Sequence, residues 1–80
     1  MGNFVNVGYG NFVNADKVVA VVSPESAPVR RLIQAARDEG TAVDVTQGRK
    51  TKAVILTDSG QLLLSALLPE TLTGRCGGEV

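Results

Sequence analysis

The chain lacks histidine and tryptophan, and Cys76 is the only cysteine among its 80 residues. A single cysteine cannot close a disulfide within the chain, and zinc sites are normally built from His and Cys, so we expect neither an internal disulfide nor a metal site. Without histidine the chain lacks the commonest general base, and its lone thiol stands in a glycine-rich tail, so the usual thiol nucleophile is missing as well. We therefore expect no enzyme and no cofactor.

Aromatic residues are few as well, namely Phe4, Tyr9 and Phe12. The core must therefore be aliphatic, and each of its side chains contributes about 1.5 to 3 kcal/mol when fully buried. So short a chain buries only about 60% of its unfolded surface, and such domains often gain stability from disulfides, metals or partner subunits. With the first two excluded, self-association is the expected source.

Long apolar runs are absent too. No stretch approaches the roughly 20 apolar residues of a membrane-spanning helix, and the first residues, MGNFVNVGYGN, lack the basic start and apolar run of a signal peptide. We expect a cytoplasmic protein without a membrane partner. The length suits one domain, which we assign to residues 1–73, with a flexible C-terminal tail at 74–80.

The apolar pattern predicts an α+β domain in the order β-β-β-α-β-β-β, with a short C-terminal helix. Two short strands at 3–6 and 11–14 flank a Gly-Tyr-Gly bend. The run at 18–22 is apolar throughout, so both of its faces should be covered. Further strands are predicted at 42–46, 53–57 and 61–67, the last two forming a hairpin around the turn at 58–60.

One amphipathic helix is predicted at 27–39. Serines and prolines at 23–28 favour a helix start, because serine caps well and proline is tolerated in the first turn. An apolar stripe follows the helical i, i+3, i+4, i+7 spacing: Val29, Leu32, Ile33 and Ala36. Gly40 stands where a left-handed residue ends a helix, and a short second helix is expected to begin at Pro69.

Charge is balanced overall but not along the chain. The chain contains eight Lys+Arg and eight Asp+Glu. Residues 47–52 nevertheless read QGRKTK, with Arg49, Lys50 and Lys52 within four positions and no carboxylate among them. Donors on a glycine-containing turn can bind phosphates, and Thr51 can add a hydroxyl contact. The alternative is a solvated loop, as charged connectors usually are.

Three further cations are candidates for nucleic-acid contact: Lys17 in a turn, and Arg30 and Arg31 near the helix start. For the two arginines, the alternative is the solvated polar face of an amphipathic helix. A single copy would bind weakly, because affinity grows with the number of phosphates neutralised. If several copies formed a ring with their basic loops on one surface, avidity would raise the affinity by about 10² to 10⁴.

Six blocks of the sequence occur in an order and spacing that carry a family resemblance: NVGYGN (6–11), VVSPESAPVRR (21–31), ARDEG (36–40), GRKTKAV (48–54), SA (65–66) and PET (69–71). Together they closely resemble the RemA family of small bacterial regulators. The likeness spans nearly the whole chain, to about Arg75.

This resemblance implies a nucleoid-associated DNA-binding activator of genes for extracellular matrix and biofilm formation, without a conventional helix-turn-helix. It also implies ring-shaped homo-oligomers, which we expect to hold seven or eight subunits, with duplex DNA held against or wrapped around the ring. The implied fold is related to the LytTR DNA-binding domain, with twisted, mostly antiparallel strands. No small-molecule substrate is expected.

The resemblance also assigns the site. The family's basic loop typically reads Gly-Arg-Arg-Thr-Arg, and its arginines correspond to Arg49, Lys50 and Lys52, while a further arginine corresponds to Lys17. We assign DNA contact to Arg49, Lys50, Lys52 and Thr51, with Lys17, Arg30 and Arg31 as supporting or interface residues. Lysine keeps the charge but lacks the planar guanidinium suited to bidentate or minor-groove contact. We therefore expect lower affinity and shallow sequence preference.

Two other functions remain open. A ring-forming structural or adaptor protein would bind protein partners and leave QGRKTK as a solvated loop. An RNA-binding protein would usually stack bases on aromatic side chains, which are scarce in this chain.

Overall fold

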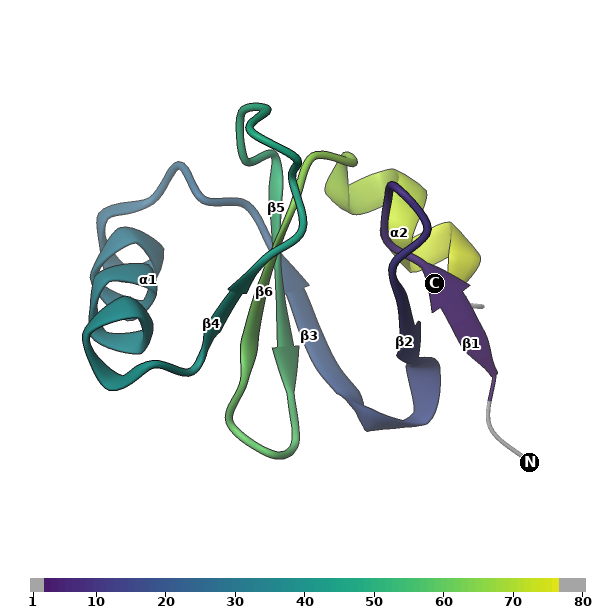
Figure 1. Ribbon diagram of the computed structural model, residues 1–80, viewed down its shortest axis with the longest axis horizontal. Helices are drawn as coiled ribbons and strands as arrows, with labels where there is room; N and C mark the ends of the chain where they lie inside the picture. The colour runs from purple at the N-terminus through teal and green to yellow at the C-terminus, as the bar shows by residue number, and fades with distance from the viewer. Residues whose placement is uncertain (1–2, 77–80) are drawn as a thin grey trace.

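The computed structural model describes residues 3–76, and its elements follow the expected order (Figure 1). The strands are β1 (Phe4–Asn6), β2 (Phe12–Asn14), β3 (Val18–Val22), β4 (Ala42–Asp44), β5 (Ala53–Thr57) and β6 (Leu62–Ser65). The helices are α1 (Ala27–Glu39) and α2 (Pro69–Arg75), and a 3-10 turn, η1 (Ala15–Lys17), joins β2 to β3. The α+β class is confirmed.

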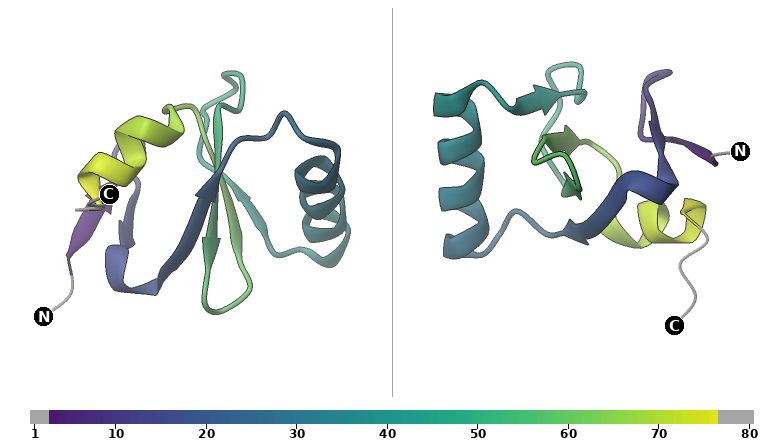
Figure 2. Two further views of the ribbon diagram at one scale, coloured as in Figure 1. Left: turned by 180° about the vertical axis from the view of Figure 1, so that it is seen from behind. Right: turned by 90° about the horizontal axis from the view of Figure 1, so that it is seen from below.

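The domain has three layers around a four-stranded sheet. Helix α1 covers one face of this sheet, and the β1–β2 hairpin and α2 lie against the other (Figures 1 and 2). Strand β5 shows why: Val54 packs in a cluster with Ala36 of α1, whereas Ile55 packs with Val5 of β1 and Leu72 of α2. Because both faces are covered, β5 is a continuous apolar run.

The four-stranded sheet has the order β3-β5-β6-β4 and is mixed. Strand β5 pairs antiparallel with both β3 and β6, so the predicted hairpin is confirmed. Strand β4 pairs parallel with β6. The connection at 45–52 carries the chain back across the sheet to β5, and the β5–β6 hairpin then inserts β6 beside β4.

The expectation that both faces of 18–22 are covered is only partly right. Val21 packs on the hairpin side and Val22 on the α1 side. Val19, however, is 68% exposed, because the register with β5 shifts between Val18 and Ala20. Bulges are common at sheet edges, where β3 lies. The extra residue interrupts the alternation of side chains between the two faces of the sheet.

Helix α1 forms where the sequence predicts it. The Ser26 hydroxyl accepts a hydrogen bond from the Val29 N–H at 3.3 Å, and Gly40 ends the helix with φ of 78°. Val29 and Ile33 pack toward the sheet, whereas Leu32 of the same apolar stripe is 49% exposed. The covered face is therefore narrower than the apolar stripe.

Helix α2 begins at Pro69 as predicted, and it extends over Gly74 and Arg75, the first two residues of the predicted tail. Residues 77–80, the remainder of that tail, lie outside the described residues. Neither of the helices within residues 3–76 has the length and apolar character needed to cross a membrane.

Candidate nucleic-acid interface

Residues 47–52, the basic loop, join β4 to β5, and their approach is held by Asp44. The Thr46 N–H and hydroxyl both donate to Asp44 Oδ1, at 2.9 and 2.6 Å. These two bonds lower the pKa of the Asp44 carboxyl, slight burial opposes them, and the charge of Arg37 adds to them. Thr46 itself is buried, so the start of the loop is anchored in the domain.

A tight turn opens the loop. The Arg49 N–H donates to the Thr46 carbonyl at 3.0 Å, and both central residues have positive φ, 56° at Gln47 and 79° at Gly48. These values match a type I′ turn, in which Asn, Asp or Gly is favoured at the position that Gln47 holds. The turn leaves the side chains of Arg49 and Lys50 exposed.

The end of the loop is fixed by the backbone carbonyl of a buried serine, Ser65. The Lys52 N–H donates to the Ser65 carbonyl at 2.8 Å. The Ser65 hydroxyl donates to the Val7 carbonyl at 2.8 Å and accepts from the Leu67 N–H at 3.1 Å. Ser65, which is fully buried, therefore joins the basic loop, the β1–β2 hairpin and the segment that leads to α2.

The loop and the hairpin turn line an open basic cavity of about 540 Å³, which we call the cationic hollow. It is lined by Asn6, Gly8, Tyr9, Arg49, Lys50, Lys52, Ala66, Leu67 and Arg75. Its lining thus contains four cations and no carboxylate. All three cations of the basic loop line this one cavity. The loop and the hairpin turn lie on the same side of the molecule (Figure 1).

Arg75 is a member of this site that sequence reasoning missed. Its Nη1 donates to the Asn6 carbonyl at 2.8 Å, which holds the guanidinium beside the hairpin. The position depends on α2 docking through Leu72, which is completely buried in the cluster that includes Val5. No local pattern near Arg75 signals this, because the contact joins residues 69 positions apart in the sequence.

Arg30 also comes close to the basic loop. A second cavity of about 820 Å³ lies between the start of α1 and the start of α2, and Arg30 lines it together with Lys50, Thr51 and Lys52. Glu25 and Glu70 line the same cavity, so its charge is mixed. Arg30 is therefore a neighbour of the candidate site, in a less cationic setting than Arg75.

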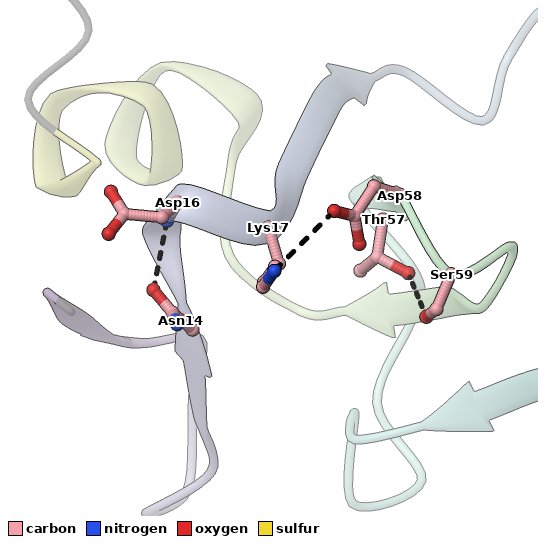
Figure 3. A network of polar contacts seen from close by, with 6 residues as sticks. All are labelled: Asn14, Asp16, Lys17, Thr57, Asp58 and Ser59. Carbon is pink, nitrogen blue, oxygen red and sulfur yellow. Dashed lines mark hydrogen bonds and ion pairs between the residues drawn. The ribbon is translucent and has the colours of Figure 1, made fainter.

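Lys17 and Arg31 are not brought to the loop. Lys17 precedes β3 and the basic loop precedes β5, and because these strands are antiparallel the two lie at opposite ends of the sheet, about 16 Å apart for a five-residue strand. Lys17 Nζ lies 3.9 Å from Asp58 Oδ2 in an exposed pair (Figure 3). Arg31 is exposed on α1 and lines neither cavity.

Within residues 3–76, the pair of Lys17 and Asp58 is the sole ion pair. Among those residues, the cations of the hollow thus have no carboxylate partner. Exposed, unneutralised cations on a loop anchored by buried groups form an anion-binding surface whose field is local, because the net charge of the chain is zero.

A family model described as RemA-like, Extracellular matrix regulatory protein A-like, matches residues 4–76. The chain belongs to the RemA-like family. The match covers every strand and helix described above and extends through Arg75. The resemblance of the sequence blocks to this family is therefore confirmed.

Several relatives of this RemA-like chain each carry the name "Putative regulatory protein". One from Halothermothrix orenii is 54% identical over 77 residues, which is 96% of this chain and 92% of the relative. One from Synechococcus elongatus is 59% identical over 71 residues (89% and 82%), and one from Geobacillus thermodenitrificans is 51% identical over 79 residues (99% and 91%). Family and relatives alike point to a regulatory protein rather than an enzyme.

Proposed function

We propose that this RemA-like protein is a transcriptional regulator that binds duplex DNA as a ring-shaped homo-oligomer. The observation that carries the proposal is the cationic hollow, where Arg49, Lys50, Lys52 and Arg75 gather without a carboxylate. Phosphate oxygens are the DNA groups that such side chains contact most often. In this proposal the regulated genes are those for extracellular matrix and biofilm formation, and the effect is activation.

One copy of the site would hold DNA weakly. Each phosphate contact on duplex DNA changes the slope of log affinity against log salt by about −0.9, and four cations per copy offer few contacts. Several copies on one rigid assembly convert later contacts into intramolecular ones, which raises avidity by about 10² to 10⁴. Firm binding by so small a domain therefore depends on multiple copies.

Exposed apolar side chains support a head-to-tail ring. Phe4 and Phe12 are 69% and 60% exposed on β1 and β2, at one end of the long axis (Figure 1). Leu32 is 49% exposed on α1, at the other end, and Val43 is 40% exposed on β4, the sheet strand on the α1 side (Figure 1). Joining two different patches of this kind gives a heterologous contact, which closes into a ring when the rotation permits.

Ring geometry would also align the DNA-contacting groups. The basic loop lies at a side of the molecule between the two apolar ends, and the hairpin turn lies on the same side, at the β1–β2 end (Figure 1). Head-to-tail stacking along the long axis would then repeat the loops on one surface of the ring. We take this ring to hold seven or eight subunits and to act in the cytoplasm at the nucleoid, and we take the fold to be related to the LytTR domain.

Sequence preference in this proposal comes from DNA shape. The loop contains a single arginine, Arg49, with Lys50 and Lys52, and ammonium groups attract phosphates without the planar fork that reads guanine edges. Thr51, which is half-buried, adds a hydroxyl contact in this proposal, and Arg30 would reach the duplex beside it. Affinity would then depend mainly on backbone charge and on how easily the DNA bends.

The remaining two cations would act elsewhere. Arg31 is exposed on α1, at the end that we assign to subunit contact, so it is an interface residue in this proposal. Lys17 would contact DNA only where the duplex also passes the opposite end of the sheet, and its ion pair with Asp58 weakens its attraction for phosphate.

Fluorescence anisotropy tests the proposal. Labelled duplex DNA and single-stranded RNA are titrated at several salt concentrations with wild type, Arg49→Ala/Lys50→Ala and Lys17→Ala, and native mass spectrometry follows the oligomer. We expect wild type to prefer duplex DNA with a steep salt slope. The double variant should flatten that slope by about 0.9 for each DNA phosphate that it no longer neutralises.

The controls separate the alternatives. Lys17→Ala should change duplex binding far less than the double variant does. RNA bound more tightly than duplex DNA would favour an RNA-binding protein, and a ring that binds neither would favour the adaptor. Undiminished DNA binding by an intact Arg49→Ala/Lys50→Ala ring would reject the basic loop as the DNA-binding segment.

A further inference from the structure

The cationic hollow has an apolar side that phosphate contact does not need. Ala66 and Leu67 line it together with Tyr9, beside the cations of the basic loop. Its volume of about 540 Å³ falls within the range of about 300 to 1,000 Å³ typical of small-molecule sites. A concave site with cations, an aromatic ring and an apolar lining suits a ligand that is itself part anion and part flat apolar ring.

Tyr9 is placed there against its backbone preference. The Asn11 N–H donates to the Gly8 carbonyl at 3.0 Å, and the central residues Tyr9 and Gly10 have φ of 55° and 77°, as in a type I′ turn. Asn, Asp or Gly is favoured at the first central position, and a bulky side chain with positive φ is a genuine outlier. Non-glycine residues in this region cluster at ligand sites.

The Tyr9 side chain is also available to a ligand, because it is 52% exposed. The turn itself gains nothing from an aromatic residue, so the exposed Tyr9 is free to contact a ligand. Arg75 is also positioned for a ligand. One guanidinium nitrogen donates to the Asn6 carbonyl at 2.8 Å, which orients the remaining N–H donors of the planar guanidinium.

We propose that the cationic hollow binds a nucleotide carrying two or three phosphates. The phosphates contact Arg49, Lys50, Lys52 and Arg75, and the base stacks on the Tyr9 ring. This inference rests on the proposed function in one respect: because the same cations serve both ligands, the nucleotide and duplex DNA exclude each other, and each lowers the affinity for the other by the same factor.

A nucleotide explains more of the site than either alternative anion does. Inorganic polyphosphate uses the cations but leaves Tyr9 and Leu67 without a role. Duplex DNA keeps its bases stacked on each other, so it offers phosphates to the cations but no free base face to a tyrosine ring. A base held on an aromatic side chain by stacking is a recurrent and sequence-tolerant mode of nucleotide recognition.

Isothermal titration calorimetry of the full-length protein tests the inference with ATP, inorganic tripolyphosphate and adenosine at low salt without divalent cations. We expect wild type to bind ATP about 5- to 150-fold more tightly than tripolyphosphate, the range that base–aromatic stacking provides. Adenosine, which lacks phosphates, should bind far more weakly than ATP.

Tyr9→Asn is the sharpest variant, because asparagine suits the turn and removes only the ring. It should lower ATP affinity to that of tripolyphosphate and leave tripolyphosphate binding unchanged. Arg75→Gln should weaken both anions. Lys17→Gln, which removes a cation at the other end of the sheet, is the matched control and should change neither.

Equal affinity of wild type for ATP and tripolyphosphate would overturn the inference, and so would a Tyr9→Asn variant that binds ATP as tightly as wild type. Competition is measured by the displacement of labelled duplex DNA with ATP. A protein that binds DNA but not ATP would refute the inference alone. A protein that binds ATP but no DNA would refute the proposed function and the competition, while the nucleotide site would stand.

Discussion

Replacing Ser65 with alanine tests whether one buried hydroxyl holds the site together. The side chain is fully buried, donates to the Val7 carbonyl at 2.8 Å and accepts from the Leu67 N–H at 3.1 Å. Alanine removes both bonds without adding volume. Val7 is also buried, so its carbonyl loses this partner where water has little access, whereas Leu67 is only half-buried.

The expected loss of stability follows from this difference. A buried polar group left without a partner costs about 1 to 3 kcal/mol, and we count one such group because water can reach the second. For a domain of this size, each kcal/mol lowers the unfolding temperature by about 4 to 8 °C. The Ser65→Ala variant should therefore unfold about 4 to 24 °C below wild type.

Thermal unfolding by circular dichroism measures this, at one protomer concentration because assembly shifts the apparent stability. Ser59→Ala is the control: its hydroxyl lies 3.1 Å from the Thr57 hydroxyl in an exposed turn (Figure 3), so its loss should cost less than about 0.5 kcal/mol. If Ser65→Ala were no less stable than Ser59→Ala, the assignment of Ser65 as the structural link would be wrong.

Three further predictions concern the loop and the assembly. The pKa of Asp44 is lower in the folded chain, so its stabilisation is present above its ordinary pKa of 3.8 and lost as pH falls through the folded value. Asp44→Asn should thus reduce the acid dependence of urea unfolding. Gln47→Asn should raise the free energy of unfolding by several tenths of a kcal/mol, because asparagine tolerates positive φ better. Phe4→Ser/Phe12→Ser should lower the oligomer mass in native mass spectrometry without unfolding the protomer, because both rings are exposed; unchanged mass would exclude this patch from the subunit contact.

The elements with local signals were predictable from the sequence. Helix α1 begins and ends where the Ser26 cap and Gly40 predicted, because capping involves neighbouring residues. The β5–β6 hairpin was predicted from its turn for the same reason. The three cations of the basic loop were found because they stand together in the chain.

Features that depend on tertiary packing were not predictable. The parallel pairing of β4 with β6 depends on how the β5–β6 hairpin inserts into the sheet. The exposure of Val19 follows from a register shift against β5, which no residue in β3 signals. Arg75 is recognisable as a site residue only from the structure, where α2 packs against β1 and its guanidinium donates to the Asn6 carbonyl.

Charge segregation explains how a chain of zero net charge can attract a polyanion. Four cations line the hollow at one end of the sheet, while Asp16 and Asp58 lie with Lys17 at the other end (Figure 3). At physiological salt the Debye length is about 8 Å, shorter than the roughly 16 Å of a five-residue strand, so carboxylates at the far end are largely screened from the hollow. A phosphate near the hollow therefore experiences mainly the charges close to it, which are the four cations and, beside Lys50 and Lys52, Glu25 and Glu70. Lower salt lengthens the screening distance, so the far carboxylates oppose DNA binding most at low salt. The neutral variant Asp58→Asn should therefore raise DNA affinity at low salt and leave it unchanged at physiological salt.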